Sequence, residues 1–214
     1  MFSKLFSKLQ RVGQSFMIPI AVLPVAGLLM GIGQSFINET MIQTYHLQFI
    51  LGKGTPLYAL FTIMCNAGKI VFDNLPALFS VGIAMGMAKH EKATAAFSAL
   101  VSFLVMHASI NALLTINGFI VDGKVADFVR LGTINTICGI QSLDTGVFGG
   151  IVVGLGVAYL HNRFYMTRLP DYLSFFAGTR FVPVICCVTF VFVGILFFYI
   201  CLLYTSDAAD DRIS

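Results

Sequence analysis

The sequence is poor in charged residues, and this shortage excludes most soluble functions. Only 11% of its 214 residues are charged, whereas 57% are hydrophobic, and the mean hydropathy is +0.88. Lys and Arg are scattered, so no basic block with interleaved aromatic residues is present to bind a nucleic acid. A helix of roughly 20 apolar residues crosses a bilayer core of about 30 Å. The composition therefore predicts a polytopic protein that has membrane lipid, and no nucleic acid, as a partner.

The sequence also lacks the residue sets of common catalytic and metal sites. Glutamate occurs only at Glu39 and Glu91, outside the apolar runs, which leaves no paired carboxylates for acid–base catalysis. No phosphate-binding P-loop and no Cys-x-x-Cys pair occurs. The five cysteines are expected to be small hydrophobic side chains without disulfides. We therefore expect no catalytic residue, no metal site and no cofactor in this chain.

Five apolar runs predict an all-α fold with about five transmembrane helices. The second run is about 48 Å long as a single helix at ~1.5 Å per residue, which is too long for a simple crossing. Asn74-Leu75-Pro76 interrupts it, and proline removes a backbone donor and disfavours a helical residue before it. We expect a broken helix there, with a plain proline kink as the alternative to a functional break. The expected crossings are 17–37, 57–88, 93–114, 144–160 and 181–203, followed by a non-native or disordered tail at 204–214.

The basic residues predict the orientation of these crossings. Cytoplasmic segments of membrane proteins carry an excess of Lys and Arg. With the amino terminus in the cytoplasm, eight basic residues lie inside and three lie outside. The inside set is Lys4, Lys8, Arg11, Lys89, Lys92, Arg163, Arg168 and Arg180, and the outside set is Lys53, Lys124 and Arg130.

Polar residues within or beside the apolar runs are candidate sites of substrate binding. Ionisable side chains are costly in a bilayer and are often functional. His107 is a candidate sugar contact or proton relay, or else a core histidine bonded to a neighbour such as Asn111. Asp144 and Thr145 open the fourth run, where a simple helix cap is the alternative. With Asn74 at the predicted break, these residues are the candidate substrate-binding set.

An inside segment from 161 to 180 alternates basic and aromatic residues around Pro170. This pattern is typical of an amphipathic segment at the membrane interface. A solvated surface is one interpretation. Docking of a cytoplasmic phosphoryl donor at Arg163, Arg168 and Arg180 is the other.

Several strings together resemble the membrane-embedded C component of phosphotransferase-system enzyme II, in its glucose, maltose and N-acetylglucosamine group. The resemblance covers about 5–203. Within it, the sequence at 139–142 is closest to the maltose and glucose types. The strings are LQRVGQSFMIPIAVLP at 9–24, DNLPALF at 73–79, GIQSLDTGVFGG at 139–150, NRFY at 162–165, LPDYL at 169–173 and FFAGTRFVP at 175–183.

The resemblance implies a permease of the bacterial inner membrane that phosphorylates its sugar, of glucose or maltose type, during uptake. In such families a phosphorylated B component, supplied by an A component, donates the phosphoryl group, and positioning and charge stabilisation supply most of the catalysis. A full-length relative is thus a protein-phosphocysteine–sugar phosphotransferase. The resemblance also suggests a homodimer, consistent with the small-xxx-small spacing of Gly27/Gly31, Gly82/Gly86 and Gly150/Gly154.

The chain departs from the family in its missing later features. The sequence contains neither a His-His pair nor a glutamate after Glu91, and the cysteine motif of the B domain is absent. By resemblance, it corresponds to the amino-terminal scaffold half, and we expect it to be inactive alone. The alternative is a non-catalytic membrane scaffold or dimerisation module. An ion-coupled transporter is disfavoured because the predicted crossings hold no obvious acidic residue well inside a span, Asp73 lying at the predicted break.

Overall fold

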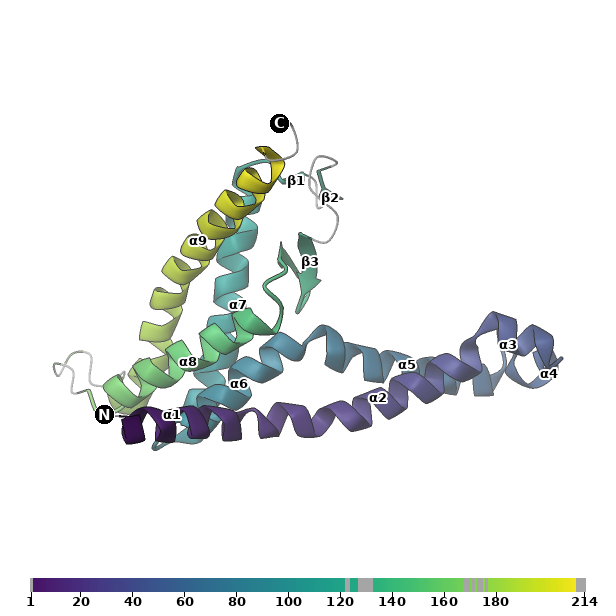
Figure 1. The fold of residues 1–214 in the computed structure, drawn as a ribbon, viewed down its shortest axis with the longest axis horizontal. Coiled ribbons are helices and arrows are strands. Elements are labelled where there is room, and N and C mark those ends of the chain that lie inside the picture. The colour runs from purple at the N-terminus through teal and green to yellow at the C-terminus, as the bar shows by residue number, and fades with distance from the viewer. Residues whose placement is uncertain are drawn as a thin grey trace. The chain divides into compact units, whose positions relative to one another are not determined.

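The computed structural model describes residues 2–121, 124–126, 133–167, 170, 172, 175 and 177–210. Their backbone is mostly α-helical (Figure 1). The chain divides into two compact units, one formed by Met17–Leu75 and the other by Met1–Phe16 together with Pro76–Ser214. Each unit is described below on its own.

The unit of residues 17–75 is a pair of antiparallel helices, α2 (Met17–Ile37) and α5 (Pro56–Asp73). Glycines let the two backbones approach closely. A Cβ atom at Gly33 would lie 2.6 Å from the Cys65 nitrogen, and one at Gly68 would lie 2.5 Å from the Ala26 oxygen. Phe36 and Phe61 stack with ring centroids 4.6 Å apart at one end of the pair. Small residues therefore set the packing, as is common between membrane helices.

Two short helices connect this pair, α3 (Glu39–Thr44) and α4 (Gln48–Leu51). The Asn38 side chain caps α3 by accepting hydrogen bonds from the Thr40 and Met41 backbone nitrogens at 2.9 and 3.3 Å. Lys53 forms an exposed ion pair with Glu39 and holds the pKa of that carboxyl below its ordinary value. The connection is thus closed by local polar contacts.

The predicted break in the second apolar run is confirmed. Helix α5 ends at Asp73 and α6 (Leu75–Met87) begins after Asn74. The Asn74 backbone nitrogen and side-chain nitrogen both donate to the Ile70 carbonyl, at 3.2 and 2.8 Å. This residue therefore terminates α5 by capping it.

The other unit contains α1 (Phe2–Ser15), α6, α7 (Lys92–Ile116), α8 (Gly146–Phe164) and α9 (Phe181–Asp210), with the one-turn helix η2 (Gly178–Arg180) before α9. Its core surrounds α7, where Phe103, Met106 and Ile110 are fully buried. Helix α9 packs along α7, and Gly194 permits this because a Cβ there would lie 2.7 Å from the Met106 oxygen. The residues that fill the remaining core include Val153, Val157, Val182, Cys186 and Phe190.

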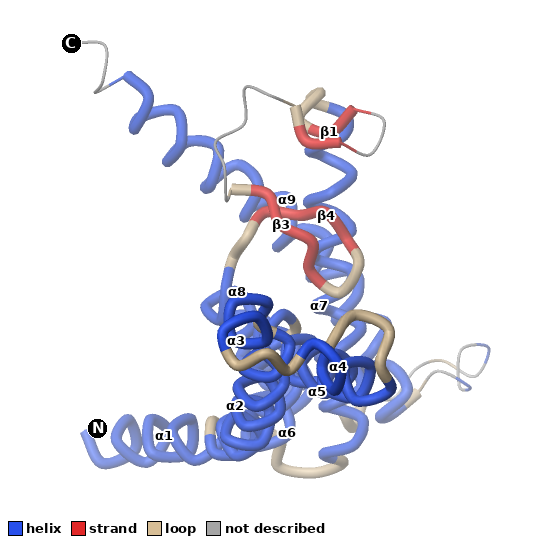
Figure 2. The backbone as a smooth tube through the Cα atoms, turned by 90° about the vertical axis from the view of Figure 1, so that its right-hand side faces the viewer, coloured by secondary structure: helices blue, strands red, loops and turns tan. Residues whose placement is uncertain are grey.

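Two short antiparallel hairpins follow α7, where the sequence predicted only a polar stretch (Figure 2). The first pairs β1 (Ile120–Val121) with β2 (Lys124–Val125), and the second pairs β3 (Ile134–Ile137) with β4 (Ile140–Leu143). Cys138 and Gly139 form the turn of the second hairpin with φ values of 50° and 83°. Positive φ at both positions is the requirement of a tight two-residue hairpin turn, and glycine meets it without strain.

Four helical stretches of the described residues are long and apolar enough to cross a membrane, and the α5/α6 pair gives up to five as a broken span. The predicted all-α polytopic membrane fold is therefore confirmed. The bilayer limits along each helix stay predictions. Helix α8 runs on to Phe164, past residue 160, where the expected crossing ends. Helix α9 likewise continues to Asp210, so the backbone of 204–210 is helical where the sequence suggested a non-native or disordered tail.

Candidate functional site

Helix α7 is tied to strand β4 by two polar side chains one turn apart. His107 Nδ1 lies 2.8 Å from the Ser142 hydroxyl, and the Asn111 side-chain nitrogen donates to the Gln141 carbonyl at 2.6 Å. The expected His107–Asn111 partnership is wrong, because each side chain bonds to a neighbouring residue of β4 instead. His107 also packs edge-on against Phe103, with ring centroids 4.5 Å apart.

Strand β4 leads directly into Asp144 and Thr145, the residues expected at the start of α8. One Asp144 carboxylate oxygen accepts a hydrogen bond from the Gly146 nitrogen at 3.0 Å, which is the first nitrogen of α8, while the N-cap residue Thr145 makes no side-chain capping bond. Its other oxygen accepts from the Asn135 side chain of β3 at 3.4 Å. The Asp144 side chain remains exposed, which leaves the carboxylate accessible to a solute.

Two buried polar atoms beside these contacts have no hydrogen-bond partner among the described residues. They are His107 Nε2 and Thr145 Oγ1. Gly149 makes room for the Thr145 side chain, because a Cβ at that position would lie 2.1 Å from Thr145 Oγ1. An imidazole, two hydroxyls, a carboxylate and two amides therefore gather around the start of α8.

The arrangement suits hydrogen bonding better than covalent catalysis. Ser142 and His107 are within hydrogen-bond distance, as a nucleophile and its base are in many hydrolases. Both side chains, however, are fully buried at 0% exposure. The pair therefore fixes β4 against α7, and the groups open to a solute are those at Asp144 and on β3.

The fourth candidate, Asn74, belongs to the unit of residues 17–75. Its side chain is half-buried and bonded to the backbone of its own helix. The structure thus gathers three of the four predicted substrate-binding residues, His107, Asp144 and Thr145, in one unit. Sequence reasoning missed Asn135 and Ser142, although two short apolar-flanked runs separated by a Gly-containing pair are a signal of a hairpin.

Two of the three candidate docking arginines lie at one end of the same unit. Arg163 is exposed in the last turn of α8, and Arg180 is exposed where η2 meets α9. The aromatic neighbours Phe164 and Phe181 contact each other edge-on, with centroids 6.4 Å apart, which brings the two helix ends together. The Arg180 guanidinium also lies 5.0 Å from the centre of the Phe175 ring. Arg168 lies outside the described residues, as do several positions of the expected amphipathic segment.

Sequence reasoning also missed a clamp at this end, formed by His161 and Asn162. His161 Nε2 donates to the His90 carbonyl at 2.8 Å. The Asn162 side chain accepts from the Lys89 nitrogen at 2.9 Å and donates to the Met87 carbonyl at 3.1 Å. These residues were assigned to a loop because they are polar and end an apolar run. Instead, they bind the α6–α7 turn to the last turn of α8.

The apolar helices and the broken span make this chain a multi-pass membrane protein. The family model described as "Phosphotransferase system, EIIC" matches residues 13–206. The chain belongs to this family, and the resemblance predicted from the sequence is confirmed.

One curated relative is similar to most of this chain. The "PTS system glucose-specific EIICBA component" of Staphylococcus saprophyticus subsp. saprophyticus is 41% identical to this chain over 189 residues. The alignment covers 88% of this chain and 26% of the relative. The chain therefore spans about a quarter of that relative's length.

Proposed function

We propose that this chain is the amino-terminal part of a sugar permease of the phosphotransferase system, of the glucose type, which phosphorylates its cargo during uptake. The observation that carries the proposal is the 41% identity to a relative named glucose-specific, within a family match over most of the chain. Nothing comparable favours maltose. By this proposal the protein lies in the bacterial inner membrane with its amino terminus in the cytoplasm.

The polar residues take roles consistent with this function. Asp144, Thr145, His107 and Asn74 are proposed to contact sugar hydroxyls, which both donate and accept hydrogen bonds. Arg163, Arg168 and Arg180 are proposed to dock the phosphorylated B component, because guanidinium groups bind phosphate and carboxylate oxygens in paired geometry. The B and A components are the partners that supply the phosphoryl group.

The proposal predicts a sharp difference between the 214-residue chain and its full-length gene product. In bacteria lacking glucose and maltose permeases, the full-length protein is expected to restore phosphoenolpyruvate-dependent phosphorylation of labelled glucose. The chain alone is expected to give none, because the His-His pair and the glutamate-containing segment of the family are absent from it. Immunoblots of membranes control for expression. Sugar phosphorylation by the chain alone, or a full-length protein inert toward glucose, would contradict the proposal.

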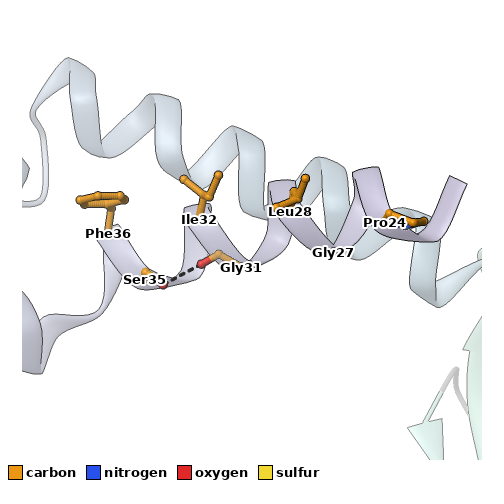
Figure 3. A pocket seen from close by; sticks show the side chains of 7 residues that line it. All are labelled: Pro24, Gly27, Leu28, Gly31, Ile32, Ser35 and Phe36. Atoms are coloured by element: carbon orange, nitrogen blue, oxygen red, sulfur yellow. Dashed lines mark hydrogen bonds between the residues drawn. The ribbon is translucent and has the colours of Figure 1, made fainter.

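The scaffold alternative is supported by an open groove on α2 (Figure 3). One of the small-residue pairs in the sequence, Gly150 and Gly154, faces α6. A Cβ at Gly150 would lie 2.1 Å from the Pro76 oxygen, and a Cβ at Gly154 would lie 2.8 Å from atoms of Ser80 and Ile83. At Gly27 and Gly31, by contrast, a Cβ would meet no atom within 4 Å. The Ser35 hydroxyl is bonded to the Gly31 carbonyl of its own helix, so the groove is apolar. We propose that a second copy of the chain packs here, as a homodimer.

Filling this groove is expected to weaken self-association without unfolding the protein. In the full-length protein, Gly31→Leu adds a side chain whose Cβ meets no described atom within 4 Å but which blocks close approach of a second helix. We expect at least a severalfold lower dimer fraction in crosslinking and mass photometry. Leu60→Ala, on an exposed part of α5, is the control. An unchanged dimer fraction in the Gly31→Leu protein would rule out this interface.

A further inference from the structure

The β3–β4 hairpin lies beside α7 and not beyond its end. The hydrogen bond from His107 fixes Ser142 at a level about 13 Å before the helix end at Ile116, at ~1.5 Å per residue. Asn111 fixes Gln141 closer to that end. Figures 1 and 2 both show the hairpin alongside α7, with β1 further along at the end of that helix.

This placement puts non-helical backbone at membrane depth. Helix α7 is 25 residues long, or roughly 38 Å, which exceeds a bilayer core of about 30 Å. A core that begins as early as Lys92 still reaches past His107 and to Asn111. Irregular backbone at such depth is tolerated only where protein covers it or where it lines a water-filled cavity.

Strand β3 is polar on both of its faces, since successive strand residues point to opposite sides, and this argues for water. Asn135 and Thr136 of β3 are exposed, and they pair with Ser142 and Gln141, the residues held by α7. Asp144 is exposed beside Asn135. A carboxylate at the bilayer centre costs about 2.5–3.5 kcal/mol even on the lowest scale, and an amide without partners also costs several kcal/mol. Contact of this strand with lipid is therefore disfavoured.

We infer that the β3–β4 hairpin borders a water-filled recess at membrane depth, in which Asn135 and Asp144, joined by a hydrogen bond, form a polar wall for a polyhydroxylated solute. The amide both donates and accepts hydrogen bonds and the carboxylate accepts them, which matches the alternating needs of sugar hydroxyls. The unpartnered His107 Nε2 and Thr145 Oγ1 add hydrogen-bonding capacity behind this wall. The solute contact rests on the proposed function, whereas the water-filled recess does not.

Cysteine labelling of the full-length protein tests both parts. Asn135→Cys and Thr136→Cys are made separately in a background without the five native cysteines. They are treated with a charged, membrane-impermeant maleimide in membranes opened to reagent on both sides. Val188→Cys is the matched control, because Val188 is 57% exposed but lies on the apolar helix α9. Labelling after denaturation measures the total thiol, and size-exclusion profiles show that each variant is folded.

We expect both hairpin thiols to react at least about tenfold faster than the Val188→Cys thiol. The thiolate is the reactive form, and apolar surroundings raise the pKa of a thiol, which lowers the thiolate fraction by about a factor of 10 per pKa unit. Glucose is expected to slow the Asn135→Cys reaction severalfold and to leave the control unchanged. Slow labelling at both hairpin positions would show the hairpin covered by lipid or by the rest of the protein and would overturn the recess. Fast labelling that glucose does not change would overturn the solute contact. If the hairpin thiols label fast in a protein that phosphorylates no sugar, the permease role is wrong and the recess is supported.

Discussion

Replacing Gly68 with leucine is expected to destroy the pairing of α2 with α5. A Cβ at this position would lie 2.5 Å from the Ala26 oxygen and 2.6 Å from the Met30 nitrogen. These are backbone atoms, so no rotamer change relieves the clash and the helices must separate. Overpacking of a closed interior costs about 1–3 kcal/mol when side chains can adjust. We expect a loss at or above the upper end of that range.

The measurement is the amount and thermal stability of folded full-length protein, by fluorescence-detected size exclusion from detergent. The matched control is Ala59→Leu, at an exposed position of α5 outside the groove on α2. It is expected to retain wild-type melting within a few degrees. Equal loss in both variants would show that leucine anywhere on α5 disturbs insertion, and that the close approach at Gly68 is not the cause.

Replacing Asp144 with alanine in the full-length protein is expected to impair sugar uptake much more than membrane insertion. The carboxylate accepts a hydrogen bond from the Gly146 nitrogen at the start of α8, and loss of a capping contact at a helix start costs about 0.5–2 kcal/mol. That cost alone leaves a well-packed helix in place. If the exposed carboxylate also contacts the solute, uptake is expected to fall at least about tenfold, the equivalent of one lost hydrogen bond to a charged group of about 1.4 kcal/mol or more.

Initial uptake rates over a range of glucose concentrations, normalised to folded protein, test this prediction. Asp144→Asn is the informative comparison, because an asparagine side chain caps a helix as well as aspartate does. It is expected to restore stability and leave uptake low. Wild-type uptake kinetics in the alanine variant would reduce Asp144 to a helix cap.

The helical part of the fold is predictable from the sequence because apolar run length and bilayer thickness decide it together. The run expected at 17–37 is helix α2 over the same residues, and the break before Pro76 is found at Asn74. Both follow from local chemistry. Local sequence patterns do not predict what happens at helix termini, where polar residues either leave the membrane or form hydrogen bonds elsewhere in the fold. His161 and Asn162 form such hydrogen bonds, and a single sequence does not distinguish the two outcomes.

The candidate site was predicted in part for the same reason. His107 was interpreted as a sugar contact, a proton relay or a core histidine bonded to a neighbour, with Asn111 as a candidate partner because residues four apart share a face. The structure pairs it with Ser142 instead, since β4 lies against α7. The hairpin itself was overlooked because its strands are only four residues long and flank a Cys-Gly turn, a weak pattern in a segment that otherwise reads as a polar loop.

The fastening of the α6–α7 turn by His161 and Asn162 has a mechanical consequence. Three hydrogen bonds join the side chains of these two residues to backbone atoms more than 70 residues away in sequence. The ends of α6, α7 and α8 at this turn are therefore fastened together. We expect any flexing that the proposed transport requires to occur at other joints of the chain.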